Sequence, residues 1–166
     1  MPTLLIDTML LTLFIVGSAS RDYITKHRRL QPYGATDFDL LVSVVSRASE
    51  VVVTPNILTE TSNWVKMIAE PARSHVAATF QLFIGVFQEQ YVTSSEAALD
   101  AEFSRFWLTD SGVLRELING HLLLTSDFHL YAAALQRGFK AVNFNDLRSA
   151  SLTRSSPRHR RRWSGR

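Results

Sequence analysis

Thr3-Leu4-Leu5-Ile6-Asp7-Thr8 is the stretch of sequence that decides the fold of this chain. Three large aliphatic residues run directly into a carboxylate, and a second apolar run, Met9 to Val16, follows at once. A continuous apolar run is typical of a strand that is buried on both faces of a parallel sheet. An Asp at the end of such a strand lies at the carboxyl edge of the sheet, where these folds bind ligands.

The rest of the chain alternates between strand and helix patterns. Besides residues 3–6, we expect strands at 50–54, 122–125 and 140–144 and a short edge strand at 91–93. Helices are expected at 8–16 (ended by Gly17), around 22–29, and at 36–49, 55–69, 72–87, 109–118 and 127–137, with another after the capping-box sequence Thr93 to Glu96. Strands separated by helices favour right-handed βαβ units and a parallel sheet. The predicted fold class is therefore α/β, a three-layer α/β/α sandwich with a central parallel sheet of four to five strands.

Composition places the chain among ordinary globular domains. Its 166 residues, 46% hydrophobic and 20% charged, are enough for one domain with a real core. The chain has no cysteine, which excludes disulfides, cysteine-based zinc sites and a thiol nucleophile. This absence also suits a cytoplasmic protein.

The charge is distributed unevenly along the chain. The whole sequence carries a net charge of +3, but residues 154–166 contain six of its eighteen basic residues and no acidic one. The preceding residues hold twelve basic against fifteen acidic side chains, a net charge of −3. We therefore predict a domain over residues 1–150 and a basic, flexible tail over residues 151–166. Arg158, Arg160, Arg161 and Arg162 in this tail are candidate RNA contacts; the alternative is a disordered terminus without a binding role.

The apolar run at the start of the chain is not expected to enter a membrane. Leu4 to Val16 is shorter than the ~20 residues that a spanning helix needs, and Asp7 lies within it. A signal peptide requires a basic leading segment, which Met1-Pro2-Thr3 does not provide. Gly17 to Ser20 has a faint similarity to a cleavage site, so secretion stays the alternative to the cytoplasmic location that we expect.

Four carboxylates are expected at the carboxyl edge of the predicted sheet. Asp7 ends the first strand, and Asp127 follows the strand at 122–125. Glu60 lies in the second turn of the helix that leaves the second strand, and Asp110 begins the helix that leads into the strand at 122–125. Each residue also has an ordinary structural explanation. Asp7, Asp110 and Asp127 could simply cap helices or complement their dipoles, and Glu60 could be a partly solvated surface residue.

The proximity of four acids favours a bound cation. Two carboxylates ~4 Å apart repel each other by about 4 kcal/mol at an effective dielectric constant of 20. A cluster of four therefore needs cations or raised pKa values, and no Lys or Arg lies within two residues of any of them. Ligand sets made only of oxygen select hard ions, which makes Mg²⁺ or Mn²⁺ the expected cofactor. Such a site suits hydrolysis of phosphodiester bonds by one or two ions.

At these residues the chain resembles the PIN-domain ribonucleases, in particular VapC-like toxins. The similarity rests on four segments: Leu5 to Thr8, Thr54 to Glu60, Leu108 to Gly112 and Leu123 to Asp127. Their order and spacing cover about residues 3–148. The resemblance implies a PIN-like α/β/α fold and cleavage of RNA that depends on Mg²⁺ or Mn²⁺.

The resemblance also implies roles for individual residues. Asp7, Glu60, Asp110 and Asp127 would be both the catalytic and the metal-binding quartet, with Thr8 and Thr125 as supporting hydroxyl groups. Two features depart from the family's usual pattern. Met9 stands where the family commonly has Asn, and the helical segment at 71–90 is longer than in compact toxins.

The sequence therefore predicts a metal-dependent endoribonuclease that hydrolyses RNA, the toxin of a toxin–antitoxin pair. Its expected partners are an RNA substrate, an antitoxin protein and a second copy of itself in a homodimer, with no membrane. The alternative is a non-catalytic PIN-like module that binds RNA or protein. A phosphatase with Asp7 as nucleophile is disfavoured, because Met9 occupies the place of the second Asp that such enzymes use. Trp107, just before Asp110, is expected either in the core or as a base-stacking surface near the site.

Overall fold

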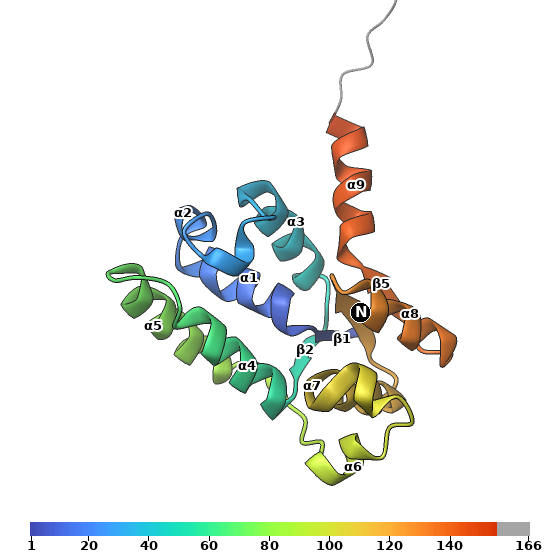
Figure 1. Ribbon diagram of the computed structural model, residues 1–166. Coiled ribbons are helices and arrows are strands. Elements are labelled where there is room, and N and C mark those ends of the chain that lie inside the picture. Colours follow the sequence, from blue (N-terminus) through green and yellow to red (C-terminus); the bar gives the residue numbers. More distant parts are fainter. Residues whose placement is uncertain (156–166) are drawn as a thin grey trace, which may run out of the picture.

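The computed structural model describes the backbone of residues 1–155 and the side chains of residues 1–153 (Figure 1). The strands are β1 (Thr3–Ile6), β2 (Glu50–Val53), β3 (Gln88–Glu89), β4 (Leu122–Thr125) and β5 (Ala141–Asn143). The α-helices are α1 (Thr8–Ala19), α2 (Arg21–Ile24), α3 (Ala35–Val45), α4 (Pro55–Val65), α5 (Ala72–Ile84), α6 (Ser94–Ala98), α7 (Phe103–Glu116), α8 (Phe128–Gln136) and α9 (Phe144–Ser155). Two short 3₁₀ helices span Arg28–Leu30 and Leu117–Asn119.

The five strands form one parallel sheet in the order β3-β2-β1-β4-β5. β1 lies in the middle, and Leu4, Leu5 and Ile6 are at most 2% exposed. In Figure 1 helices α1 to α5 gather on one side of the sheet, while α6 to α8 lie on the other. The predicted α/β/α sandwich with a parallel sheet is confirmed. The central position of β1 places Asp7 in the middle of the carboxyl edge.

Helix caps explain why several of the helices begin where they do. Asp7 caps α1 by accepting a hydrogen bond from the backbone N–H of Leu10, and Thr54 caps α4 in the same way, with Pro55 in the first helical position. The capping box of Thr93 and Glu96 is present at α6. These local signals start helices immediately after β1 and β2, so the first residues of α1 and α4 lie near the same edge of the sheet.

The bounds of some elements differ from the expected ones. Gly17 does not end α1 but lies inside it, where a side chain would meet the ring of Phe38 on α3. The short edge strand is β3 at 88–89, rather than 91–93. α7 spans Phe103–Glu116, but the non-helical backbone of Trp107 divides it into two helical parts. Asp110 lies in the first turn of the second part, as expected.

The last described helix, α9, continues past residue 150 to Ser155 and in Figure 1 extends away from the body of the protein. Arg158, Arg160, Arg161 and Arg162, the candidate RNA contacts, lie outside the described residues. Within residues 1–155, no helix is long and apolar enough to cross a membrane.

The contact between Gly17 and Phe38 yields a stability prediction. A Cβ atom at Gly17 would stand 2.2 Å from Cδ2 of Phe38, so Gly17→Ala should destabilise the protein by roughly 1–3 kcal/mol through overpacking. Gly85→Ala is the matched control, because its Cβ would meet only an ordinary contact of 3.5 Å. Urea unfolding of both variants tests the contact. Equal midpoints for wild type and Gly17→Ala would show that Phe38 moves aside freely.

Candidate active site

One cleft at the carboxyl edge of the sheet brings the four predicted acids together. Asp7, Glu60, Asp110 and Asp127 all line a cavity of about 410 Å³. Its other lining residues are Thr8, Met9, Tyr33, Trp64, Ser126 and Leu130, so none of the described lining residues is basic. Acids that are as far apart as 120 positions in the sequence thus share one cleft, as the strand order requires.

Asp7 is the most firmly held of the four acids. Its Oδ1 accepts the N–H of Leu10 at 2.8 Å, and its Oδ2 accepts both the hydroxyl of Thr125 at 2.5 Å and the N–H of Ser126 at 2.8 Å. Burial raises the pKa of the Asp7 carboxyl, and these three hydrogen bonds oppose the rise by stabilising the charged form. A carboxylate offers about four acceptor sites, so one is left for a ligand. Asp7 is therefore a helix cap and a cleft residue at once.

Glu60 is held across the cleft by the first residue of α1. The hydroxyl of Thr8 donates to Oε2 of Glu60 at 2.7 Å and so links α1 to α4. Thr8 is buried, whereas Glu60 is only partly buried. Thr8, expected as a supporting hydroxyl group, thus contacts Glu60 rather than Asp7.

Asp127 lies on the other side of Asp7 and caps α8. Its Oδ1 accepts the backbone N–H groups of His129 and Leu130 at 2.7 and 3.1 Å. Its own N–H donates to the hydroxyl oxygen of Thr125 at 2.9 Å. The capping explanation for Asp127 is therefore correct, and it does not exclude a role in the cleft, because Oδ2 takes no part in the cap. Thr125, buried between Asp7 and the Asp127 backbone, connects the two acids.

Asp110 is the least satisfied of the four acids. It lies on α7 three residues after the kink, is partly buried, and its carboxylate makes no hydrogen bond within the described part of the chain. Desolvation raises the pKa of Asp110 to about 7, and the negative charges of Asp127, Asp7 and Glu60 add to the rise. Burial is thus the main cause of the shift, and the repulsion expected among the four acids adds to it.

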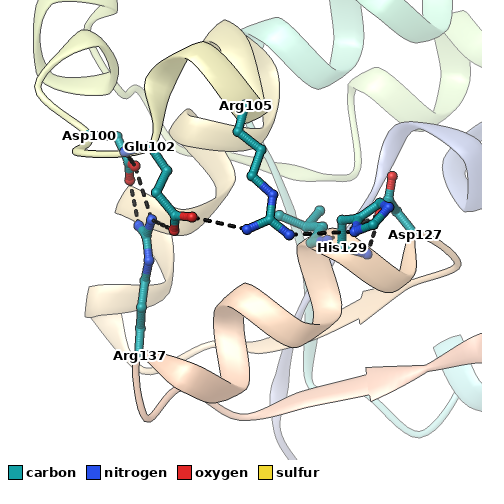
Figure 2. Close-up of polar contacts among 7 residues, drawn as sticks. Asp100, Glu102, Arg105, Asp127, His129 and Arg137 are labelled. Atoms are coloured by element: carbon teal, nitrogen blue, oxygen red, sulfur yellow. Dashed lines mark hydrogen bonds and ion pairs between the residues drawn. The ribbon is translucent and has the colours of Figure 1, made fainter.

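A chain of polar contacts connects α7 to α8 (Figure 2). Arg137 pairs with Asp100 and donates to Glu102 at 3.0 Å, and Glu102 accepts a hydrogen bond from Arg105, also at 3.0 Å. Nη2 of Arg105 lies 3.4 Å from Nδ1 of His129, whose backbone N–H binds Asp127. The network fixes the start of α7 against α8, and thereby the element that carries Asp110 against the one that begins at Asp127.

Tyr33 is a cleft residue that sequence reasoning missed. It lies in the loop before α3, where neither a strand end nor a helical pattern draws attention to it. Arg148 of α9 holds this loop by donating to the carbonyl of Pro32 at 2.7 Å and to Asp37, while its guanidinium lies 4.8 Å from the centre of the Tyr33 ring. Burial raises the pKa of Tyr33, and the charge of Asp7 adds to this. The phenol is therefore a neutral donor beside the acids.

Trp64 and Ser126 were also missed as cleft residues. Trp64 is partly buried and lines the cleft one helical turn after Glu60. That spacing of four residues is a signal that could have identified it. Ser126 contributes its backbone N–H to Asp7 and is itself held by Asn145, whose side chain donates to the Ser126 carbonyl at 3.0 Å. No side-chain pattern in the sequence marks a backbone donor of this kind.

The cleft has the donor chemistry for a hard cation, although its side chains are not gathered around one point. Among residues 1–155, no three His, Cys, Asp or Glu side chains are arranged so as to hold a metal ion. Apart from the phenol of Tyr33, the ionisable groups that line the cleft are nevertheless carboxylates, as Mg²⁺ and Mn²⁺ prefer. Rotation of the Asp110 side chain breaks no hydrogen bond with the described residues. The residues present therefore fit such an ion.

Comparison with models of protein families found no match to this chain. Comparison with curated protein sequences found none either.

The raised pKa of Asp110 predicts how stability depends on pH. The folded state binds the proton of the Asp110 carboxyl more tightly than the unfolded state does. The resulting loss of stability therefore begins as the pH rises above 3.8, grows until about pH 7 and is constant at higher pH. A shift of this size corresponds to at most about 4 kcal/mol. In EDTA, Asp110→Asn should therefore raise the melting temperature more at pH 8 than at pH 4.5. Asp146→Asn, at an exposed position after β5, is the control. A pH-independent effect of Asp110→Asn would contradict the raised pKa of Asp110.

Proposed function

We propose that this protein is a metal-dependent endoribonuclease that hydrolyses phosphodiester bonds in RNA at the cleft of four carboxylates. The observation that carries the proposal is that Asp7, Glu60, Asp110 and Asp127 line one cavity in which none of the described lining residues is basic. The raised pKa values of Asp7 and Asp110 support it: burial is their main cause, and the negative charges of neighbouring acids add to the rise. The similarity to PIN-domain ribonucleases in four segments supplies the reaction and the substrate class.

The four acids would hold Mg²⁺ or Mn²⁺. Such an ion, when bound, lowers the pKa of a water molecule and stabilises negative charge at phosphate. The chain's own contribution is to position the ligands. Three donors fix Asp7, Thr8 orients Glu60, and Thr125 spaces Asp7 from Asp127. Asp110 supplies the most weakly held carboxylate and therefore the one that adapts to a bound ion.

Tyr33 completes the arrangement with a neutral donor. Its ring is fixed by Arg148 and by Phe144, whose ring centre lies 6.4 Å away. With its raised pKa, the phenol stays protonated at neutral pH and can donate a hydrogen bond to a phosphate oxygen.

The biological setting belongs to the same proposal. By its resemblance to VapC-like toxins, the protein would act in the cytoplasm as the toxin of a toxin–antitoxin pair, as a homodimer, with an antitoxin covering the cleft. A small reading frame adjacent to the gene, whose product co-purifies with this protein and suppresses cleavage, would support this setting.

A second candidate function is a PIN-like module that binds RNA or protein without cleaving it. The observation in its favour is that no three acids among the described residues are gathered for metal coordination. Under this alternative the raised pKa values keep the cleft partly protonated and free of metal.

Cleavage of RNA by point variants distinguishes these functions. Asp127→Asn and Glu60→Gln should each lower the rate of Mn²⁺-dependent cleavage of a labelled RNA mixture at least 100-fold, because each removes a charged ligand. Asn caps helices as well as Asp does, so Asp127→Asn should stay folded. Asp7→Asn is a poorer choice, since the amide would face the donors of Thr125 or Ser126.

The control for this experiment is Asp146→Asn. Asp146 follows β5 near the same edge of the sheet but does not line the cleft. Equal cleavage by the wild type and by both cleft variants would mean that the cleavage does not take place at this site. That result would refute the proposal. No cleavage by the wild type, combined with RNA binding, would favour the non-catalytic module.

A further inference from the structure

The start of α9 lies against two segments that line the acidic cleft and are far apart in the sequence. One is the loop that carries Tyr33, and the other is the loop that carries Ser126. The side-chain amide of Asn145 donates to the Ser126 carbonyl at 3.0 Å. The ring centre of Phe144 lies 6.4 Å from that of Tyr33. The first turn of α9 therefore contacts both segments.

Arg148, one turn further along α9, binds the Tyr33 loop at several points. Its Nε donates to Oδ1 of Asp37 at 2.7 Å, and its Nη2 donates to Oδ2 of Asp37 at 3.1 Å and to the carbonyl of Pro32 at 2.7 Å. Its Cζ lies 4.8 Å from the centre of the Tyr33 ring. A guanidinium presents five donors in a rigid fork, which a lysine ammonium cannot imitate. One side chain thus fixes the residues before and after Tyr33 as well as the ring.

The ion pair between Arg148 and Asp37 is well shielded from solvent. The two side chains are only 26% and 20% exposed, whereas those of Arg21 and Asp39, a second ion pair on α3, are 58% and 54% exposed. Ion pairs that are open to solvent contribute little. Asp37 also accepts the N–H of Gly34 at 2.9 Å and so fixes the start of α3. Of these two ion pairs, we therefore expect only that of Arg148 to hold the loop in place.

Tyr33 connects this loop to the centre of the cleft. Its hydroxyl is hydrogen-bonded to the side chain of Ser126, and the backbone N–H of Ser126 donates to Asp7 at 2.8 Å. Arg148 is therefore connected, through Tyr33, to the most firmly held of the four acids. Beyond Arg148, α9 extends away from the body of the protein (Figure 1), and Leu152 is 69% exposed. The contacts with the cleft thus come from the start of the helix.

We propose that Arg148 is a positioning residue, which holds the Tyr33 hydroxyl where it can donate to a phosphate oxygen of the substrate. The start of α9 is then a clasp that joins the Tyr33 loop to the Ser126 loop. The inference rests on the proposed ribonuclease function and adds that cleavage depends on a residue that does not line the cleft. A displacement of about 1 Å at a group that contacts the reacting atoms can lower a rate about 100-fold.

Rates of Mn²⁺-dependent RNA cleavage by single and double variants test the clasp. Tyr33→Phe removes the hydroxyl and should lower the rate about tenfold, as expected for the loss of one hydrogen bond to a charged group. Arg148→Gln should lower the rate of the parent protein to a similar extent. In the Tyr33→Phe background it should lower the rate less than twofold further, because both residues act through the same hydroxyl. Arg148→Lys keeps the charge but not the fork, so it should still lower the rate about fivefold.

Hydrogen exchange of the metal-free protein measures the same loop without any cleavage. The N–H of Tyr33 donates to the carbonyl of Leu30, and the N–H of Gly34 donates to Asp37. Arg148→Gln should speed the exchange of both N–H groups about tenfold, because the loop then opens locally. The N–H of Leu58, which donates within the first turn of α4, should exchange as in the wild type.

Arg21→Gln is the matched control, because Arg21 also pairs with an Asp of α3 but does not line the cleft. It should leave cleavage and loop exchange unchanged. Independent, multiplying losses in the double variant, full activity of Arg148→Lys, or unchanged exchange in the Tyr33 loop would each overturn the clasp.

The two kinds of measurement separate the clasp from the ribonuclease function. Cleavage that no substitution of Arg148 changes would refute the clasp alone. Faster loop exchange in Arg148→Gln, in a protein that cleaves no RNA, would refute the ribonuclease and still support the attachment of the loop by α9. Should Arg148→Gln not fold, the milder Arg148→Lys gives both readouts, with the same expected directions.

Discussion

The hydrogen bonding of the Asp7 carboxylate is the interaction on which the rest of this structure depends. Asp7 is 6% exposed and joins three elements, because it accepts hydrogen bonds from α1, from the end of β4 and from the loop after β4. A buried carboxylate is costly unless hydrogen bonds satisfy it. The three donors meet that requirement and at the same time fix β1, β4 and α1 relative to one another at the carboxyl edge. The feature that stabilises the centre of the fold thus also presents a charge to the cleft.

The other three acids of the cleft reach it through the same strand order, and their negative charges repel that of Asp7. Glu60 lies on α4, which follows β2, and Asp127 follows β4, while Asp110 lies on α7. All three line the same cleft as Asp7. Each added carboxylate makes ionisation of the others less favourable, and at Asp110 this effect adds to the rise in pKa that burial causes. A fold whose stability alone mattered would do better with neutral side chains in this cleft. We therefore propose that the four acids, oriented by polar contacts such as those from Thr8 and Thr125, hold a cation.

Much of the fold and of the acidic cleft could be predicted because their signals are local. The buried strands 3–6, 50–54 and 122–125 have continuous apolar sequences, and Asp7, Thr54 and Asp127 are cap residues in the expected places. What could not be predicted depends on contacts between distant segments. The close contact of Gly17 with Phe38 joins α1 to α3, the position of Tyr33 depends on Arg148, and the kink at Trp107 has no pattern in the sequence. The resemblance identified the quartet of acids, but the hydrogen bonds that hold them became visible only in three dimensions.

Titration of the metal-free protein with Mn²⁺ tests the central claim, that the four carboxylates form a cation site, most directly. Calorimetry at pH 6.5 in two buffers of different ionisation enthalpy gives both the affinity and the number of protons released. Because a metal ligand must be deprotonated and the pKa of Asp110 is raised to about 7, we predict binding that releases protons at pH 6.5 and far fewer at pH 8.5. Asp110→Asn should bind more weakly and lose this difference. No binding of Mn²⁺ by the folded protein, or binding that releases no protons and is unchanged in Asp110→Asn, would contradict the account.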